Sequence, residues 1–257
     1  MTEDTGHVHR YVDMTLPSLQ RWAIGVAFAV ISRGAPAQTL ANSYLRAEFD
    51  AQGLRALIDR TDGRRYGLEA DGFSVTIDNE TLIGRTLTPP TRQVEPQRVS
   101  YRYSAGPVAL TVRYELRPDW RFLSKQIEVR VARTPGFRVR EVELIRETFD
   151  DTPTTFYEPP SARANLQTGV YGSAVRFDSS HSLLVVIQNP FLAARRSERA
   201  LALRYAPDMD WKTSYGAFVS DRALIAPRQQ FPSQRRRRCA PRQAHSARRP
   251  PPLSAQR

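Results

Sequence analysis

Residues 99–116 read Val-Ser-Tyr-Arg-Tyr-Ser-Ala-Gly-Pro-Val-Ala-Leu-Thr-Val-Arg-Tyr-Glu-Leu. Apolar and polar side chains alternate in both halves of this stretch, and Gly106-Pro107 interrupts them. A period of two is typical of a strand that buries one face, and Gly-Pro is a strong turn signal. The stretch therefore predicts two β-strands that are joined by a turn.

The same alternation recurs along most of the chain, and turn residues such as Arg117-Pro-Asp119 and Asp178-Ser-Ser180 separate the runs. The further runs are Phe73–Ile77, Phe122–Val131, Phe137–Ile145, Ala174–Phe177 and Leu183–Ile187. The best candidate for a helix is the short segment Glu198–Leu203. Many short strands at such spacing predict an all-β fold, a large antiparallel sandwich or barrel, over residues 38–227.

A hairpin near residue 50 adds a more specific clue. Strand-like residues 42–49 lead through the turn Asp50-Ala-Gln-Gly53 into Leu54–Asp59, and Thr61–Arg64 turns the chain again. The Gly-Leu-x-x-Leu-x-Asp-x-x-x-Gly-Arg pattern of residues 53–64 resembles the opening of the β-supersandwich (galactose-mutarotase-like) domains of carbohydrate-active enzymes. The N-terminal domain of melibiase-type glycoside hydrolases is one example. Residues 114–127 are similar to the long paired strands of those domains, and the resemblance implies a large antiparallel β-sandwich with a carbohydrate-related role.

Composition limits the remaining possibilities. The single cysteine, Cys239, excludes an intrachain disulfide and a cysteine-cluster zinc site. The net charge of +12 comes mostly from residues 228–257, which hold nine arginines, no lysine and no acid. The whole chain has only two lysines, Lys125 and Lys212, a skew typical of GC-rich bacterial genes. The basicity therefore belongs to a tail and gives no reason to expect a nucleic-acid-binding domain.

The N-terminus has the parts of a secretory signal peptide. Arg21 precedes the uncharged run Trp22–Ile31, and Ala35-Pro-Ala37 forms a small-x-small cleavage site before Gln38. Ten apolar residues rise about 15 Å as a helix, half of a bilayer's hydrocarbon thickness, so a membrane span is disfavoured. A buried core helix is the other interpretation. We expect residues 1–37 to be removed, the protein to be secreted or periplasmic, and no membrane contact after cleavage.

Catalytic chemistry has little support in the sequence. A mutarotase-like site would need a pair of histidines and a carboxylate, but residues 38–227 contain only His181, in a turn where a solvated role is expected. Melibiase-type hydrolysis relies on a separate downstream barrel, and no stretch here alternates strands with long helices. We therefore predict no catalytic residues and no cofactor in this chain.

One local constellation suits a glycan: Tyr205-Ala-Pro-Asp208-Met-Asp210-Trp211-Lys212. An aromatic ring stacks on the apolar face of a sugar, while carboxylates accept hydrogen bonds from its hydroxyls. Asp208, Asp210, Trp211 and the more distant Tyr171 are thus the candidate ligand-binding residues. The alternative is that Trp211 and Trp120 plug the sandwich. Calcium would need more oxygen ligands than the two aspartates supply, so no metal is predicted.

The tail changes character at Arg228. Apolar alternation stops there, and Arg235–Arg238 and Pro250-Pro-Pro252 follow. Such a composition predicts disorder. It is typical of a frameshifted reading of a GC-rich gene, of a native disordered tail, or of an arginine-rich arm for nucleic acid or anionic lipid.

These observations favour a non-catalytic carbohydrate-associated domain of a secreted glycoside hydrolase, truncated before its catalytic barrel. Its partners would be an oligo- or polysaccharide and the missing catalytic domain. Two rivals stay open: a complete small carbohydrate-active enzyme that uses Asp208, Asp210 or Glu158, and a secreted binding protein with a basic tail.

Overall fold

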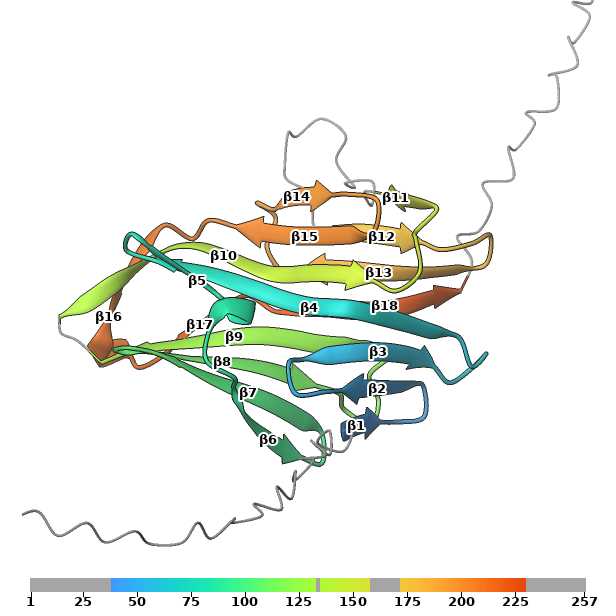
Figure 1. Cartoon of the computed structure of the whole chain (residues 1–257), viewed down its shortest axis with the longest axis horizontal. Helices are drawn as coiled ribbons and strands as arrows, with labels where there is room; N and C mark the ends of the chain where they lie inside the picture. Colours follow the sequence, from blue (N-terminus) through green and yellow to red (C-terminus); the bar gives the residue numbers. More distant parts are fainter. Residues whose placement is uncertain (1–37, 133–134, 158–171, 230–257) are drawn as a thin grey trace, which may run out of the picture. The chain divides into compact units, whose positions relative to one another are not determined.

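The computed structural model describes residues 38–132, 135–157 and 172–229. The predicted signal peptide, Tyr171, Glu158, Cys239 and nearly all of the basic tail lie outside these residues. Within them, every strand pairing is antiparallel and the strands form two large sheets (Figure 1). The sandwich predicted from the sequence is confirmed.

The first sheet has the order β1-β2-β3-β4-β10-β15-β14, with β5 paired to β4 and β16 paired to β10. Its strands are β1 (Gln38–Ala41), β2 (Leu45–Phe49), β3 (Leu54–Asp59), β4 (Arg65–Ile77), β5 (Glu80–Ile83), β10 (Gly136–Phe149), β14 (Ala193–Arg196), β15 (Ala200–Tyr205) and β16 (Met209–Lys212). The predicted hairpin around residue 50 is β2–β3.

The second sheet has the order β11-β12-β13-β18-β9-β8-β7-β6, with β17 paired to β9. Its strands are β6 (Thr91–Glu95), β7 (Arg98–Ala105), β8 (Val108–Glu115), β9 (Leu123–Val131), β11 (Thr155–Tyr157), β12 (Gly172–Arg176), β13 (His181–Ile187), β17 (Phe218–Val219) and β18 (Ala223–Gln229). Only the 3₁₀ turns η1 (Gly84–Thr86) and η2 (Thr213–Tyr215) are helical among the described residues.

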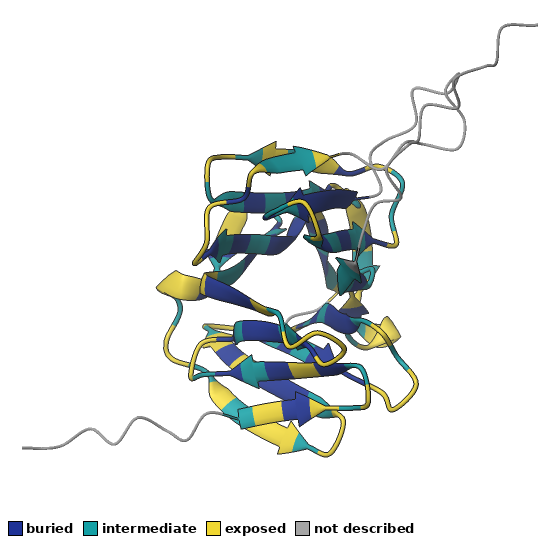
Figure 2. Ribbon diagram, turned by 90° about the vertical axis from the view of Figure 1, so that its right-hand side faces the viewer, coloured by how far each residue is buried: buried dark blue, intermediate teal, exposed yellow. Residues whose placement is uncertain are grey.

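The core lies between the two sheets because alternate residues of each strand point inward. In β9, for example, Leu123, Ile127 and Val129 are fully buried, while Arg130 is exposed. Buried residues alternate in the same way with intermediate and exposed ones along many strands (Figure 2). One continuous hydrophobic cluster joins residues of both sheets, such as Phe49 and Val75 of the first and Tyr101 and Ile127 of the second.

Two local expectations need correction. Glu198–Leu203, the best helical candidate, leads into and forms part of β15, because Leu201, Leu203 and Tyr205 alternate as buried residues. The run expected at residues 73–77 is only the end of a 13-residue strand, β4, which begins at Arg65. The Asp71 carboxylate within this strand is paired inside the sandwich with Lys125.

β18 continues two residues past Pro227, where the sequence predicts the tail to begin. Arg228 pairs with Ser182 and Gln229 with His181 across β13. The first two residues of the predicted tail therefore belong to a strand. No helix among the described residues is long and apolar enough to cross a membrane.

Candidate functional site

The loop predicted to hold a glycan lies at one end of the sandwich, where β16 pairs with the start of β10 (Figure 1). Trp211 is opposite Phe137, and Asp210 is opposite Arg138. A Cβ atom on Gly136 would lie 2.3 Å from the carbonyl oxygen of Trp211, so only glycine allows the two backbones to approach this closely. The position of Trp211 thus depends on Gly136.

A shallow hollow of about 360 Å³ opens at this end. It is lined by Asp78, Pro135, Gly136, Phe137, Arg138, Asp210, Trp211 and Lys212. The hollow therefore combines two aromatic residues with charged side chains, which is the mixture that a sugar-binding surface requires. Two of the residues predicted from the sequence, Asp210 and Trp211, line it directly.

Trp211 is half-buried. Its indole N–H donates a hydrogen bond of 3.1 Å to the carbonyl oxygen of Gly216. Its ring contacts the buried Phe218 edge-on at 5.5 Å and the 63% exposed Tyr215 edge-on at 5.7 Å. Trp211 therefore packs against the core on one side and reaches the hollow on the other, which joins the two roles that the sequence left open.

The carboxylates of Asp208 and Asp210 are both held by one guanidinium. Arg138 Nε lies 2.9 Å from Asp208 Oδ1, and Arg138 Nη1 lies 3.3 Å from Asp210 Oδ1. The hydrogen bond from Arg138 lowers the pKa of Asp208 below its ordinary value. Asp208 thus stays ionised at neutral pH, so it accepts hydrogen bonds but cannot serve as the general acid of a glycosidase.

Tyr215 is the residue of this end that the sequence analysis missed. It lies in η2, three residues after the end of β16, and its ring has Lys212 Nζ 5.9 Å from its centroid. In the sequence, Tyr215 is only an aromatic residue four positions after Trp211, and the alternation of a strand does not predict that two residues at this spacing are in contact. Only the turn of η2 brings the two rings together.

A group of buried ionisable side chains occupies the centre of the sandwich. Lys125 of β9 crosses from the second sheet to Asp71 of β4 and Glu147 of β10, and these three side chains are 0%, 1% and 3% exposed. Lys125 Nζ also donates to the carbonyl oxygen of Gly72 at 2.9 Å, and the Tyr114 hydroxyl donates to Asp71. In the sequence, Lys125 stands out only as one of two lysines.

The pKa values of this buried cluster are set by burial and by the charges inside it. Burial and the neighbouring Asp71 raise the pKa of Glu147 well above its ordinary value. Burial opposes ionisation of Asp71 too, but Lys125 and hydrogen bonds prevail and lower its pKa. Burial therefore favours the protonated form of Glu147 beside the Lys125–Asp71 ion pair. Because the three side chains are almost completely shielded from solvent, the cluster joins the sheets and is not an accessible acid–base site.

His181 differs from the solvated turn residue expected. It is the first residue of β13, and its side chain is 28% exposed. Its Nδ1 lies 2.8 Å from Asp178 Oδ2, and its Nε2 lies 3.4 Å from Asp62 Oδ2. Backbone N–H donation from Ser180 lowers the pKa of Asp178 to about 2, so this carboxylate is ionised beside the imidazole. The contacts place His181 between two turns, away from the β16 hollow.

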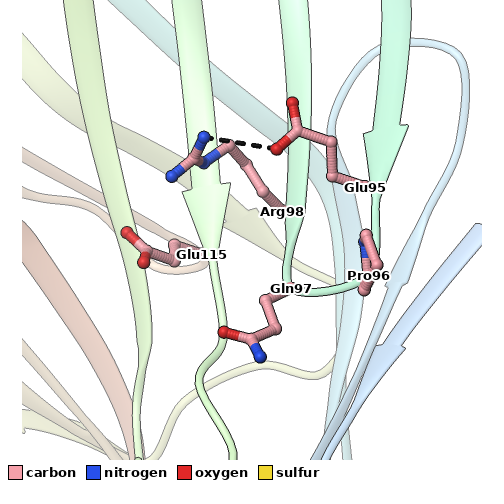
Figure 3. A pocket seen from close by; sticks show the side chains of 5 residues that line it. All are labelled: Glu95, Pro96, Gln97, Arg98 and Glu115. Carbon is pink, nitrogen blue, oxygen red and sulfur yellow. Dashed lines mark hydrogen bonds and ion pairs between the residues drawn. The ribbon is translucent and has the colours of Figure 1, made fainter.

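A second hollow of about 290 Å³ lies beside the turn between β6 and β7 (Figure 3). Glu95, Pro96, Gln97, Arg98 and Glu115 line it. Arg98 Nη1 lies 3.3 Å from Glu95 Oε2, and no aromatic ring contributes to the wall. This hollow offers polar contacts without a stacking surface. In the part of the chain that the structure describes, no group of three or more His, Cys, Asp or Glu residues is arranged to hold a metal ion.

No protein-family model matches the chain, and no curated protein sequence matches it significantly. Among solved structures, a candidate aldose 1-epimerase from Escherichia coli K12 is similar at 9% identity and a TM-score of 0.49, covering 76% of this chain and 99% of that one. A galactose mutarotase-like protein from Lactobacillus casei ATCC 334 is similar at 12% identity and a TM-score of 0.42, covering 76% and 100%.

An alpha-mannosidase from Enterococcus faecalis V583 is similar at 11% identity and a TM-score of 0.48. That match covers 75% of this chain but only 29% of the mannosidase. The side chains of this chain, and not these distant likenesses, carry the functional conclusion.

Proposed function

We propose that this chain is a carbohydrate-contacting β-sandwich domain of a secreted glycoside hydrolase, and that the glycan meets the β16 end. The single observation that carries the proposal is the hollow that both Trp211 and Asp210 line, with the exposed ring of Tyr215 in contact with Trp211. A sugar ring would stack on the aromatic side chains while its hydroxyls donate to the carboxylates. Asp208 and Asp210 each use one oxygen on Arg138, which leaves the other oxygen for a hydroxyl group.

The domain's role in this proposal is binding and not hydrolysis. The described residue with a strongly raised carboxyl pKa, Glu147, is buried, and the accessible Asp208 is held ionised by Arg138. Glycoside hydrolysis needs an accessible acid together with a second carboxylate. A catalytic domain of the parent protein would therefore do the chemistry, and reading the downstream DNA in the other two frames tests whether one follows.

Binding is tested with soluble oligosaccharides of galactose, mannose and glucose, titrated onto the full chain and onto Tyr215→Ala. Because Tyr215 is 63% exposed, its truncation leaves the stability within about 0.5 kcal/mol of wild type. Losing a stacking ring should weaken binding about fivefold, since such contacts contribute about 1 kcal/mol. Phe191→Ala, which removes a 74% exposed ring outside the hollow, is the matched control. Equal affinity of all three proteins would refute the site.

A further inference from the structure

The arginines in the described part of the chain differ in the partners of their guanidinium groups. On the first sheet they are typically paired with carboxylates, as in Arg204–Glu141 at 2.9 Å and Arg199–Glu69 at 3.0 Å. Arg121 and Arg222, in contrast, have no carboxylate partner among the described residues and lie against aromatic rings instead. A guanidinium that is stacked but not neutralised keeps its edge available for an anion.

These two arginines belong to a single surface cluster, which we call the arginine platform. It consists of Arg117, Arg121, Arg222, Tyr44, Trp120 and Phe122. Arg117 Cζ lies 4.7 Å and Arg222 Cζ 5.4 Å from the ring centroid of Trp120, and Arg121 Cζ lies 4.4 Å from that of Tyr44. Phe122 stacks on Trp120 at 4.5 Å with an interplanar angle of 24°. Two arginines thus lie against Trp120, and the third lies against Tyr44.

Arg222 of the platform lies on the outer side of the second sheet. Lys125 and Ile127 of β9 point into the core, so Gln126 between them points outward, and Arg222 Nη2 donates to Gln126 Oε1 at 3.2 Å. Trp120 precedes the start of β9, whereas Phe218, which contacts Trp211, pairs with Val129 near its end. The six steps of strand from Leu123 to Val129 span about 20 Å at the usual rise.

The loop that carries the platform is held in place before any ligand arrives. The Asn42 side-chain amide donates to the carbonyl oxygens of Arg117 and Trp120, at 2.7 Å each. Its carbonyl oxygen accepts from the backbone N–H groups of Tyr44 and Leu45. Asn42 thus ties the loop between β8 and β9 to the start of β2. Such preorganisation reduces the entropy lost when a ligand binds.

We propose that the arginine platform binds an acidic polysaccharide through the carboxylate or sulfate groups of its sugars. Guanidinium pairs bidentately with either group, and several arginines at one place suit a polymer with repeated charges. Neutral sugars fit the platform poorly, because Phe122 and the guanidiniums already cover the Trp120 ring. The same covering argues against a nucleic acid, whose unpaired bases need open aromatic faces. The choice of a polysaccharide rests on the proposed function, whereas the requirement for anionic groups rests on the arginines alone.

Two acidic residues near the arginine platform reduce its positive charge. Arg117 Nε lies 2.7 Å from Glu115 Oε1, so Arg117 is already partly neutralised, and Glu115 connects the platform to the hollow beside β6 and β7. Asp119 is exposed in the turn between Arg117 and Trp120. Since Asp119 would repel an approaching carboxylate, Asp119→Asn should bind an acidic polysaccharide more tightly than wild type, by about two- to threefold.

The test compares polygalacturonate, dextran sulfate, neutral dextran and duplex DNA on the full chain. The charge-neutralising pair Arg121→Gln and Arg222→Gln, made together, should weaken polygalacturonate or dextran sulfate binding at least tenfold. Which of the two polymers binds more tightly distinguishes a carboxylate from a sulfate ligand. Arg102→Gln combined with Arg130→Gln is the control, because it removes two exposed arginines of the same sheet outside the platform. The control also accounts for non-specific attraction to the tail, which all variants keep.

Three results would overturn the proposal. The first is an equal loss in the platform and control variants, which would make the binding a net-charge effect. The second is tighter binding of duplex DNA than of either acidic polysaccharide, and the third is no change in Arg121→Gln/Arg222→Gln with an unaltered melting temperature. If that variant has a lowered melting temperature, Arg121→Lys/Arg222→Lys is used instead. It keeps both positive charges but loses the bidentate geometry of the guanidinium groups, so it should retain only part of the affinity. Neutral oligosaccharide binding at the β16 end stays unchanged throughout, so failure here is separable from failure of the proposed function.

Discussion

Replacing Lys125 by methionine removes the one cation of the buried cluster while keeping nearly the same side-chain volume. Asp71, 1% exposed, then loses its counter-ion and keeps only neutral hydrogen-bond donors, among them the Tyr114 hydroxyl and the Leu54 backbone N–H at 2.8 Å. Breaking a buried ion pair on one side costs about 3–5 kcal/mol. For a domain of this size that corresponds to a loss of about 6–20 °C in melting temperature.

Urea unfolding monitored by tryptophan fluorescence measures this loss directly. Arg130→Met is the matched control, since Arg130 lies on the same strand but is 67% exposed and pairs with Glu128 at the surface. The control should change stability by less than about 0.5 kcal/mol. The double variant Lys125→Met/Asp71→Asn should recover more than about 1.5 kcal/mol, because neither partner is then left charged. A Lys125→Met protein within about 1 kcal/mol of wild type would refute the cluster as the link between the sheets.

Three further outcomes follow from the same structure. Burial raises the pKa of Glu147 in the folded protein above its ordinary value of 4.5. The stability that protonated Glu147 contributes is therefore fully present below pH 4.5 and is lost as the pH rises. Above pH 4.5 the free energy of unfolding of Glu147→Gln should therefore rise relative to that of wild type, by up to about 1.4 kcal/mol per pH unit. A constant difference in stability between the two proteins from pH 4 to 7 would contradict this. Gly136→Ala should lower the melting temperature by several degrees because its Cβ would lie 2.3 Å from the Trp211 carbonyl oxygen, and an unchanged melting temperature would contradict this. Deleting residues 230–257 should leave the melting temperature of the sandwich almost unchanged, and a fall of more than a few degrees would show that the tail packs on it.

The fold was predictable because period-two alternation is a local property of the sequence. Val108–Glu115 can be assigned to a strand from its own residues, and it is one. The run Phe73–Ile77 was recognisable in the same way, but the eight residues of β4 before it were not, because they place the charged Asp71 inside the sandwich. Asp71 is tolerated there because Lys125, 54 residues away in the chain, pairs with it. No local pattern carries that information.

The candidate site was predictable only in part for the same reason. Asp210 and Trp211 stood out as an acid beside an aromatic residue, and both line the hollow. Their partner Arg138 lies 70 residues from Asp208 and was invisible to sequence reasoning. The arginine platform was missed because its members come from three separate segments, around residues 44, 120 and 222. Distant segments meet through sheet topology, which a single sequence does not display.

The central claim, that a glycan contacts the β16 end, is tested most directly by the indole N–H resonances of the protein in solution. The chain has three tryptophans, Trp22, Trp120 and Trp211, so the signals are few and can be assigned with single substitutions. Titration with neutral galactose, mannose or glucose oligosaccharides should shift the Trp211 resonance, whose N–H bonds Gly216, and leave Trp120 in place. An unmoved Trp211 signal at a saturating concentration of a bound oligosaccharide would contradict the account.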